Sequence, residues 1–109
     1  MSEHKFVDIV SYLELTSVNI DFSSGDAQTI VAAPGAGKRI RIVSLDLTAA
    51  SAVEVAIKSG TTTIRTIQAT QYSWNPAIPV NLGTNAALVL DATTATRISG
   101  GVSYYVETV

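Results

Sequence analysis

The sequence of 109 residues contains no cysteine and only one histidine, one methionine and one tryptophan. The lack of cysteine excludes a disulfide framework and thiolate metal sites, and it is typical of a protein made in a reducing cytoplasm. With His4 as the single histidine, a metal site would need carboxylate ligands, which suit calcium or magnesium. The aspartates do not follow calcium-loop spacing. We therefore expect neither a metal site nor a cofactor.

Charge is scarce as well, since charged residues make up 15% of the chain and the formal net charge is −2. The lysines and arginines form no run, which argues against a surface that follows nucleic-acid phosphates. No segment approaches the roughly 20 apolar residues of a membrane span. No apolar stretch of signal-peptide length follows the charged residues near the N-terminus. We expect a protein made in the cytoplasm, with neither nucleic acid nor membrane as partner.

What the chain has in abundance is valine, isoleucine and threonine, which pack well on pleated strands. In Ala52–Lys58, apolar Val53, Val55 and Ile57 alternate with their neighbours, as expected of a strand with one buried face. Similar alternation marks residues 18–22, 86–90 and 102–106, and Gly, Pro and Asn turn signals separate these segments. The pattern predicts one all-β domain, a sandwich or barrel of about eight strands. Residues 69–79 are the longest expected irregular connection.

The stretch AAPGAGKRIRIVSLDL, Ala32–Leu47, raises the question of a phosphate-binding loop. Such a loop needs a glycine five residues before Gly37 and a hydroxyl residue after Lys38, because backbone N–H groups hold the phosphates and the hydroxyl binds Mg²⁺. Ala32 and Arg39 occupy those two positions. The loop must also open a helix, whereas the residues from Arg39 onward alternate as a strand. The sequence predicts a tight turn that leads into a strand.

The same stretch contains a change of parity. Ile40 and Ile42 share one side of the expected strand, and Leu45 and Leu47 share the other. A bulge at Val43-Ser44, or a bend that passes the strand between two sheets, brings all four side chains to the core. A strand buried on both faces near its middle is the alternative.

No arrangement of residues points to catalysis. A Ser-His-Asp triad would have to use His4, no nucleophile-elbow pattern is present, and no pair of carboxylates is singled out. We expect no catalytic residues. Tyr72 and Trp74 are candidates for glycan contacts, because exposed aromatic rings stack on sugars, although packing in the core or at an interface is the favoured interpretation of Trp74. Tyr104 and Tyr105 point to opposite faces of the last strand, so one of them is expected in the core.

Two long segments, APGAGKRIRIVSLDLTAASAVEVAIKSGTTTI and NAALVLDATTATRISGGVSYYVE, together resemble a recurrent pattern in small virion proteins of tailed bacteriophages. The pattern is a Pro-Gly turn with a basic residue before an I-x-I strand, a strand ending Lys-Ser-Gly, an A-L-x-L strand and a closing I-S-G-x-V-x-Y strand. It covers roughly residues 33–107. The residues that carry it are Pro34, Gly35, Gly37, Lys38, Ile40, Ile42, Lys58, Ser59, Gly60, Ala87, Leu88, Leu90, Ile98, Ser99, Gly100, Val102 and Tyr104.

The resemblance implies an antiparallel β-sandwich, a jelly roll, that serves as a structural part of a virion. The implied function is that of a capsid decoration (cement) protein on the outer head surface, with a glycan-binding or structural module of a tail or fibre as the alternative. The implied partners are the major capsid protein and further copies of the chain, as a dimer or trimer.

The N-terminal segment lies outside this pattern. Residues 1–15 are either an arm that lies on the capsid or exchanges with a neighbour, or the first strand of the sandwich formed by residues 16–109. The candidate interface residues in this segment are Phe6, Ile9, Tyr12 and Leu13.

Overall fold

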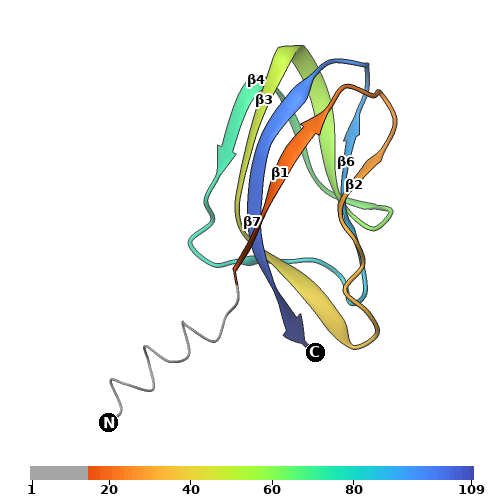
Figure 1. The fold of residues 1–109 in the computed structure, drawn as a ribbon, viewed down its shortest axis with the longest axis vertical. Helices are drawn as coiled ribbons and strands as arrows, with labels where there is room; N and C mark the ends of the chain where they lie inside the picture. Colours follow the sequence, from red (N-terminus) through yellow and green to blue (C-terminus); the bar gives the residue numbers. More distant parts are fainter. Residues whose placement is uncertain (1–14) are drawn as a thin grey trace.

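The computed structural model describes residues 15–109, which form strands, turns and loops without a helix. Its seven strands all pair in antiparallel fashion (Figure 1). They are β1 (Thr16–Phe22), β2 (Gln28–Val31), β3 (Lys38–Ser59), β4 (Thr62–Trp74), β5 (Val80–Asn81), β6 (Leu88–Ala92) and β7 (Ile98–Thr108). The predicted all-β, antiparallel sandwich is confirmed, while the jelly-roll connectivity stays a prediction.

The long strand β3 organises the fold. Its first part, from Lys38 to Ala49, pairs with β7, and its last part, from Val55 to Ser59, pairs with β6. Strand β4 runs along the other edge of β3, with an interruption in the pairing between Thr48 and Val53. Around this interruption the β3–β4 hairpin bends over, so one curled sheet supplies both layers (Figure 1). The first layer contains β1 and β7, and the second contains β6 and β2.

The change of parity in β3 is produced by a bulge. In the pairing with β7, Ile42 lies opposite Tyr104 and Ser44 lies opposite Ser103, so Val43 is an extra residue. An extra residue reverses the alternation of side chains beyond it. The predicted bulge is therefore confirmed, and the passage of β3 from one layer to the other is a separate feature that begins beyond Thr48. It also follows that the two strands expected at residues 39–47 and 52–58 are parts of one strand.

The core lies between the two layers and is made of aliphatic side chains. All the buried residues of the described part are apolar, and none is polar or charged. Burial of this kind provides the main favourable term in folding. The side chains that are almost completely buried are Ile20, Ile40, Ile42, Leu45, Ile57, Leu88, Leu90, Ile98 and Val102.

Strand β7 approaches β3 closely at Gly100. Gly100 has a φ of +150° and lies opposite Leu47. A Cβ atom here would lie 2.8 Å from the carbonyl carbon of Asp46 and 3.1 Å from the Cα of Leu47, and closer still to the Asp46 carbonyl oxygen. Only glycine fits this position without displacing the backbone of the neighbouring strand. The glycine of the I-S-G-x-V-x-Y pattern therefore has a packing reason.

The expected irregular connection over residues 69–79 is wrong in its first half. Strand β4 continues to Trp74, and only the stretch from Asn75 to Pro79 is irregular. Two successive polar residues, Thr70 and Gln71, interrupt the alternation along β4, so the sequence does not indicate one continuous strand there. Pairing with β3 from Leu45 to Thr48 holds this part of β4 in the sheet.

Candidate interaction surfaces

The glycine-rich stretch before β3 forms a turn over residues 35–38, and Asn85 from another loop holds this turn in place. The Lys38 N–H donates to the Gly35 carbonyl at 3.2 Å, and Gly35 and Gly37 have φ values of +115° and +74°. Asn85, itself at a φ of +53°, accepts a hydrogen bond from the Gly35 N–H through Oδ1 at 2.9 Å, and its own N–H donates to the Lys38 carbonyl at 2.6 Å. Strand β3 begins at Lys38, where a phosphate-binding loop would begin a helix. The prediction of a turn that leads into a strand is confirmed.

Tyr72 and Trp74 lie together near the end of β4. Their ring centroids are 6.5 Å apart at an angle of 49°, and both half-buried rings pack against the core. The guanidinium of Arg65 lies 5.0 Å from the Trp74 ring centroid. Arg65 pairs with Ile57 in the second layer, whereas Trp74 pairs with Leu45 in the first. This cation–π contact therefore joins the two arms of the bent hairpin, and it covers part of the ring surface that a sugar would need.

The closing strand places its two tyrosines on opposite faces. Tyr104 is half-buried against the core, as the alternation predicts. Tyr105 is more deeply buried, at 6% exposure, although it lies on the outer face. The guanidinium of Arg41 lies 5.5 Å from its ring centroid. Tyr104 therefore packs partly buried against the core, whereas Tyr105 is the buried tyrosine, with a basic side chain beside its ring.

Arg39, Arg41 and Glu107 form an ion-pair cluster beside this tyrosine. The Arg39 Nε donates to Glu107 Oε1 at 2.6 Å, and the Arg41 Nη1 donates to Oε2 at 3.2 Å. The hydrogen bond from Arg39, with the charges of both arginines, holds the pKa of the Glu107 carboxyl below its ordinary value of 4.5, against a smaller opposing effect of burial. The cluster connects the start of β3 to the end of β7.

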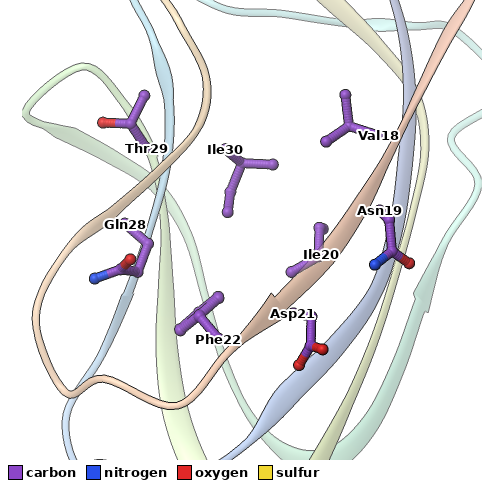
Figure 2. A pocket seen from close by; sticks show the side chains of 8 residues that line it. All are labelled: Val18, Asn19, Ile20, Asp21, Phe22, Gln28, Thr29 and Ile30. Atoms are coloured by element: carbon purple, nitrogen blue, oxygen red, sulfur yellow. The ribbon is translucent and has the colours of Figure 1, made fainter.

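A groove separates the two strands at the ends of the curled sheet. Neither β1 nor β2 has a second strand neighbour among residues 15–109, and their unpaired edges face one another. The groove has a volume of about 190 Å³. In Figure 2 the side chains of Val18, Ile20 and Ile30 lie in the space between the two strands, whereas Asp21 points away from it. The remaining lining residues are Asn19, Phe22, Gln28 and Thr29.

Three aspartates accept hydrogen bonds from side chains that are distant in the sequence. Asp21 accepts from the Arg97 guanidinium at 3.2 and 3.3 Å, Asp91 accepts from Lys58 at 2.9 Å, and Asp46 accepts from the Ser73 hydroxyl at 2.9 Å. Across residues 15–109, no three acidic or histidine side chains come together as metal ligands would. A search of the same residues finds no helix long and apolar enough to span a membrane.

The candidate interface residues Phe6, Ile9, Tyr12 and Leu13 lie outside the described residues, so these predictions stay open. The choice between an arm and a first strand for residues 1–15 also stays open, although the described part has β1 beginning at Thr16. Within the described part, the large apolar side chains most exposed to solvent are Leu15, Ile64, Ile78, Val106 and Val109.

Sequence reasoning missed the groove. Val18 and Phe22 belong to a segment whose alternation predicts a strand with one buried face, whereas no strand is predicted around Ile30. All three side chains are only partly buried, because β1 and β2 are the two strands that lack an outer neighbour. Strand order across the sheet depends on contacts between distant segments, so no local signal in the sequence identifies these residues as a groove.

Comparison with known proteins adds no family assignment. No protein-family model matches this chain, and a search of curated proteins finds no similar sequence.

Proposed function

We propose that the chain is a capsid decoration protein of a tailed bacteriophage, which binds the outer head surface and stabilises contacts between capsomers. The observation that carries this proposal is the ordered series of turn and strand signatures that resembles small virion proteins. The residues of that series lie in the three strands at the centre of the sheet order, β3, β6 and β7, and in the turns next to them. The likeness therefore concerns the residues that determine this fold.

The sheet edges support a function in binding other proteins. Strand β4 pairs only with β3 in the part of the chain that the structure describes, which leaves one edge of a 13-residue strand unpaired. Arg65 is the single charged residue of β4, and most of its other exposed residues are threonine and glutamine. An exposed strand edge can pair with a strand of another chain. Few charges then lose their hydration, so contact with a protein lattice costs little.

The mechanism is physical. A decoration protein at the junction of capsomers buries surface against each of them, and separating the capsomers then requires these contacts to be broken as well. Specific protein interfaces bury about 1,200–2,000 Å² in total. Binding only to the assembled lattice stabilises that lattice by mass action. The proposed partners are the major capsid protein and other copies of the chain.

A reconstitution experiment tests this proposal. Purified protein is added to phage heads that lack it, and the heads are then separated from free protein by sedimentation. We expect saturable binding with a fixed number of copies per head, together with greater resistance of the heads to heat or to a chelator. Unassembled capsid protein is the control and should bind less. If the protein does not sediment with the heads, the proposal is wrong.

The pair of rings at Tyr72 and Trp74 favours a second candidate function, that of a glycan-binding module of a tail or fibre. Both rings are half-buried, so part of each remains accessible. A glycan array separates the two functions when it includes Trp74→Ala as a control. Glycan binding that is lost in this variant supports the second function, whereas head binding that is retained in the variant supports the first.

A further inference from the structure

We propose that the groove between β1 and β2 is an acceptor site for the N-terminal segment of a neighbouring copy, with residues 6–13 of that copy as the occupant. This inference does not depend on the capsid proposal, because it concerns contacts between copies of this chain alone.

The groove has the features of an incomplete sheet. The edges of β1 and β2 that face it pair with no other strand of residues 15–109, so their backbone N–H and C=O groups on this side can pair with an added segment. An occupant that pairs with the free edge of β1 or of β2 would extend the curled sheet by one strand. The groove thus provides hydrogen-bonding groups on both sides.

The lining of the groove specifies an apolar occupant. Val18, Phe22 and Ile30 are partly exposed and pack against the core, and Ile20 is almost fully buried at 1% exposure. Figure 2 shows Val18, Ile20 and Ile30 reaching into the same space from the two strands. The volume of about 190 Å³ is somewhat larger than a cavity of about 150 Å³ that holds a benzene molecule. One or two aliphatic side chains would fill it.

Residues 6–13 have the matching composition. Their sequence is FVDIVSYL, in which both sets of alternate residues are mainly apolar. One set contains Val7, Ile9 and Leu13, and the other contains Phe6, Val10 and Tyr12. Whichever set faces the groove, it brings aliphatic or aromatic side chains to an apolar lining. The single charge in this stretch, on Asp8, leaves little charge to be desolvated.

The position of this segment favours a neighbour over the same chain. Residues 1–14 lead directly into β1, which forms one side of the groove. To enter its own groove, the segment would have to reverse direction between Tyr12 and Ser17, but this stretch contains no glycine, proline, asparagine or aspartate. Those residues are the ones that tight hairpin turns require. Only Glu14 and Leu15 separate the proposed occupant from β1, and the extended chain from Leu13 to Thr16 spans about 10 Å, so the accepting groove of the neighbour would lie beside the start of β1.

Cysteine cross-linking of the full chain tests this inference, because the natural chain has no cysteine. Ile9→Cys and Val10→Cys place a thiol in either set of the N-terminal segment. Ile30→Cys places a thiol in the groove, and Val18→Cys does so from the other strand in case the first variant fails to fold. Ile64→Cys, which is exposed at 37% on β4, is the matched control. Each N-terminal variant is mixed with a groove variant under mild oxidation. One of the two proteins carries a tag, so that mixed dimers are distinguished by mass.

We expect mixed disulfide dimers between an N-terminal variant and a groove variant. At micromolar protein they should form at least about tenfold more than with Ile64→Cys, because a docked cysteine experiences an effective concentration near the millimolar range. Equal yields with the groove and control cysteines would overturn the inference. In a double variant with Ile9→Cys and Ile30→Cys, a disulfide that forms only within single chains would overturn the assignment to a neighbour. Failure of head binding would leave this result unaffected, so the two proposals are tested separately.

Discussion

Replacement of Gly100 by alanine should destabilise the protein severely. The added Cβ would lie 2.8 Å from the Asp46 carbonyl carbon and 3.1 Å from the Leu47 Cα, in addition to its overlap with the Asp46 carbonyl oxygen. Since all these atoms belong to backbone, no side-chain rotation relieves the overlap. Strands β3 and β7 would have to separate at the centre of the first layer. Alanine would also adopt a φ of +150°, which side chains with a Cβ rarely allow.

The two effects can be given magnitudes. Overpacking costs about 1–3 kcal/mol, and a residue in a rarely allowed backbone conformation costs about 1–3 kcal/mol more. The sum of about 2–6 kcal/mol is a large part of the roughly 5–15 kcal/mol that stabilises an ordinary domain. A loss of this size lowers the melting temperature of a small domain by about 8 °C or more.

Thermal unfolding followed by circular dichroism measures this effect, and the next residue provides a matched control. A Cβ at Gly101 would meet nothing nearer than the Val18 carbonyl oxygen at 3.5 Å, which is an ordinary contact. We expect Gly101→Ala to melt within about 3 °C of the natural protein, since surface changes without a clash stay within about 0.5 kcal/mol. If Gly100→Ala melts as high as Gly101→Ala, the close approach of β3 and β7 is not as described.

Three further predictions concern polar contacts. Because its folded pKa is depressed, Glu107 should contribute stability above pH 4.5 that is lost as the pH falls through the folded pKa. The difference in urea midpoint between the natural protein and Glu107→Gln should therefore shrink below pH 4.5, and a difference that stays constant through this range would argue against the ion-pair cluster. A double-mutant cycle of Arg65→Ala and Trp74→Leu should give a coupling of about 0.5–1 kcal/mol, and additive effects would argue against the cation–π contact. The free energy of unfolding of Asn85→Ala, measured with urea, should fall by about 1–2 kcal/mol, because the side-chain hydrogen bond is lost and alanine is strained at a positive φ. The free energy of unfolding of Asn85→Gly should fall less, because glycine adopts this φ without strain.

Local patterns predicted much of the fold. Alternation identified Ile20 of β1, Leu88 and Leu90 of β6 and Val102 of β7 as core residues, although Val106, which shares a side with Val102, is 44% exposed. The glycines at 35 and 37 identified the turn before β3. Each of these features depends on neighbouring residues alone, through side-chain parity or the φ angle that a turn requires. The same reasoning identified the aromatic pair at Tyr72 and Trp74 as notable, but placed it in a loop.

The features that the sequence did not reveal depend on contacts between distant segments. Arg65 and Trp74 are nine residues apart on one strand, and they meet only because the β3–β4 hairpin bends over. The burial of Tyr105 on an outer face depends in part on Arg41 from another strand. The groove exists because β1 and β2 happen to be the two ends of the sheet order. Strand order is a global property, so parity within one segment carries no information about it.

The bulge in β3 is visible both in the local sequence pattern and in the pairing with the distant strand β7. It leads to a prediction about deletions. Ile40 and Ile42 differ in parity from Leu45 and Leu47, yet all four are buried, because Val43 is an extra residue between them. Removing Val43 leaves the four apolar residues in regular alternation, and Ser44 would follow Ile42 just as Ser103 precedes Tyr104 on the partner strand.

Deletion of Val43 should therefore preserve the fold at a cost within the usual range of about 0.5–3 kcal/mol for a single change. Deletion of Glu54, from a regular part of the same strand, should abolish folding, because it turns the residues on one side of the gap to the opposite face. Circular dichroism and urea unfolding of the two variants provide the measurement. Equal damage from both deletions would show that the bulge has a structural function beyond restoring the parity, such as setting the curvature of the sheet.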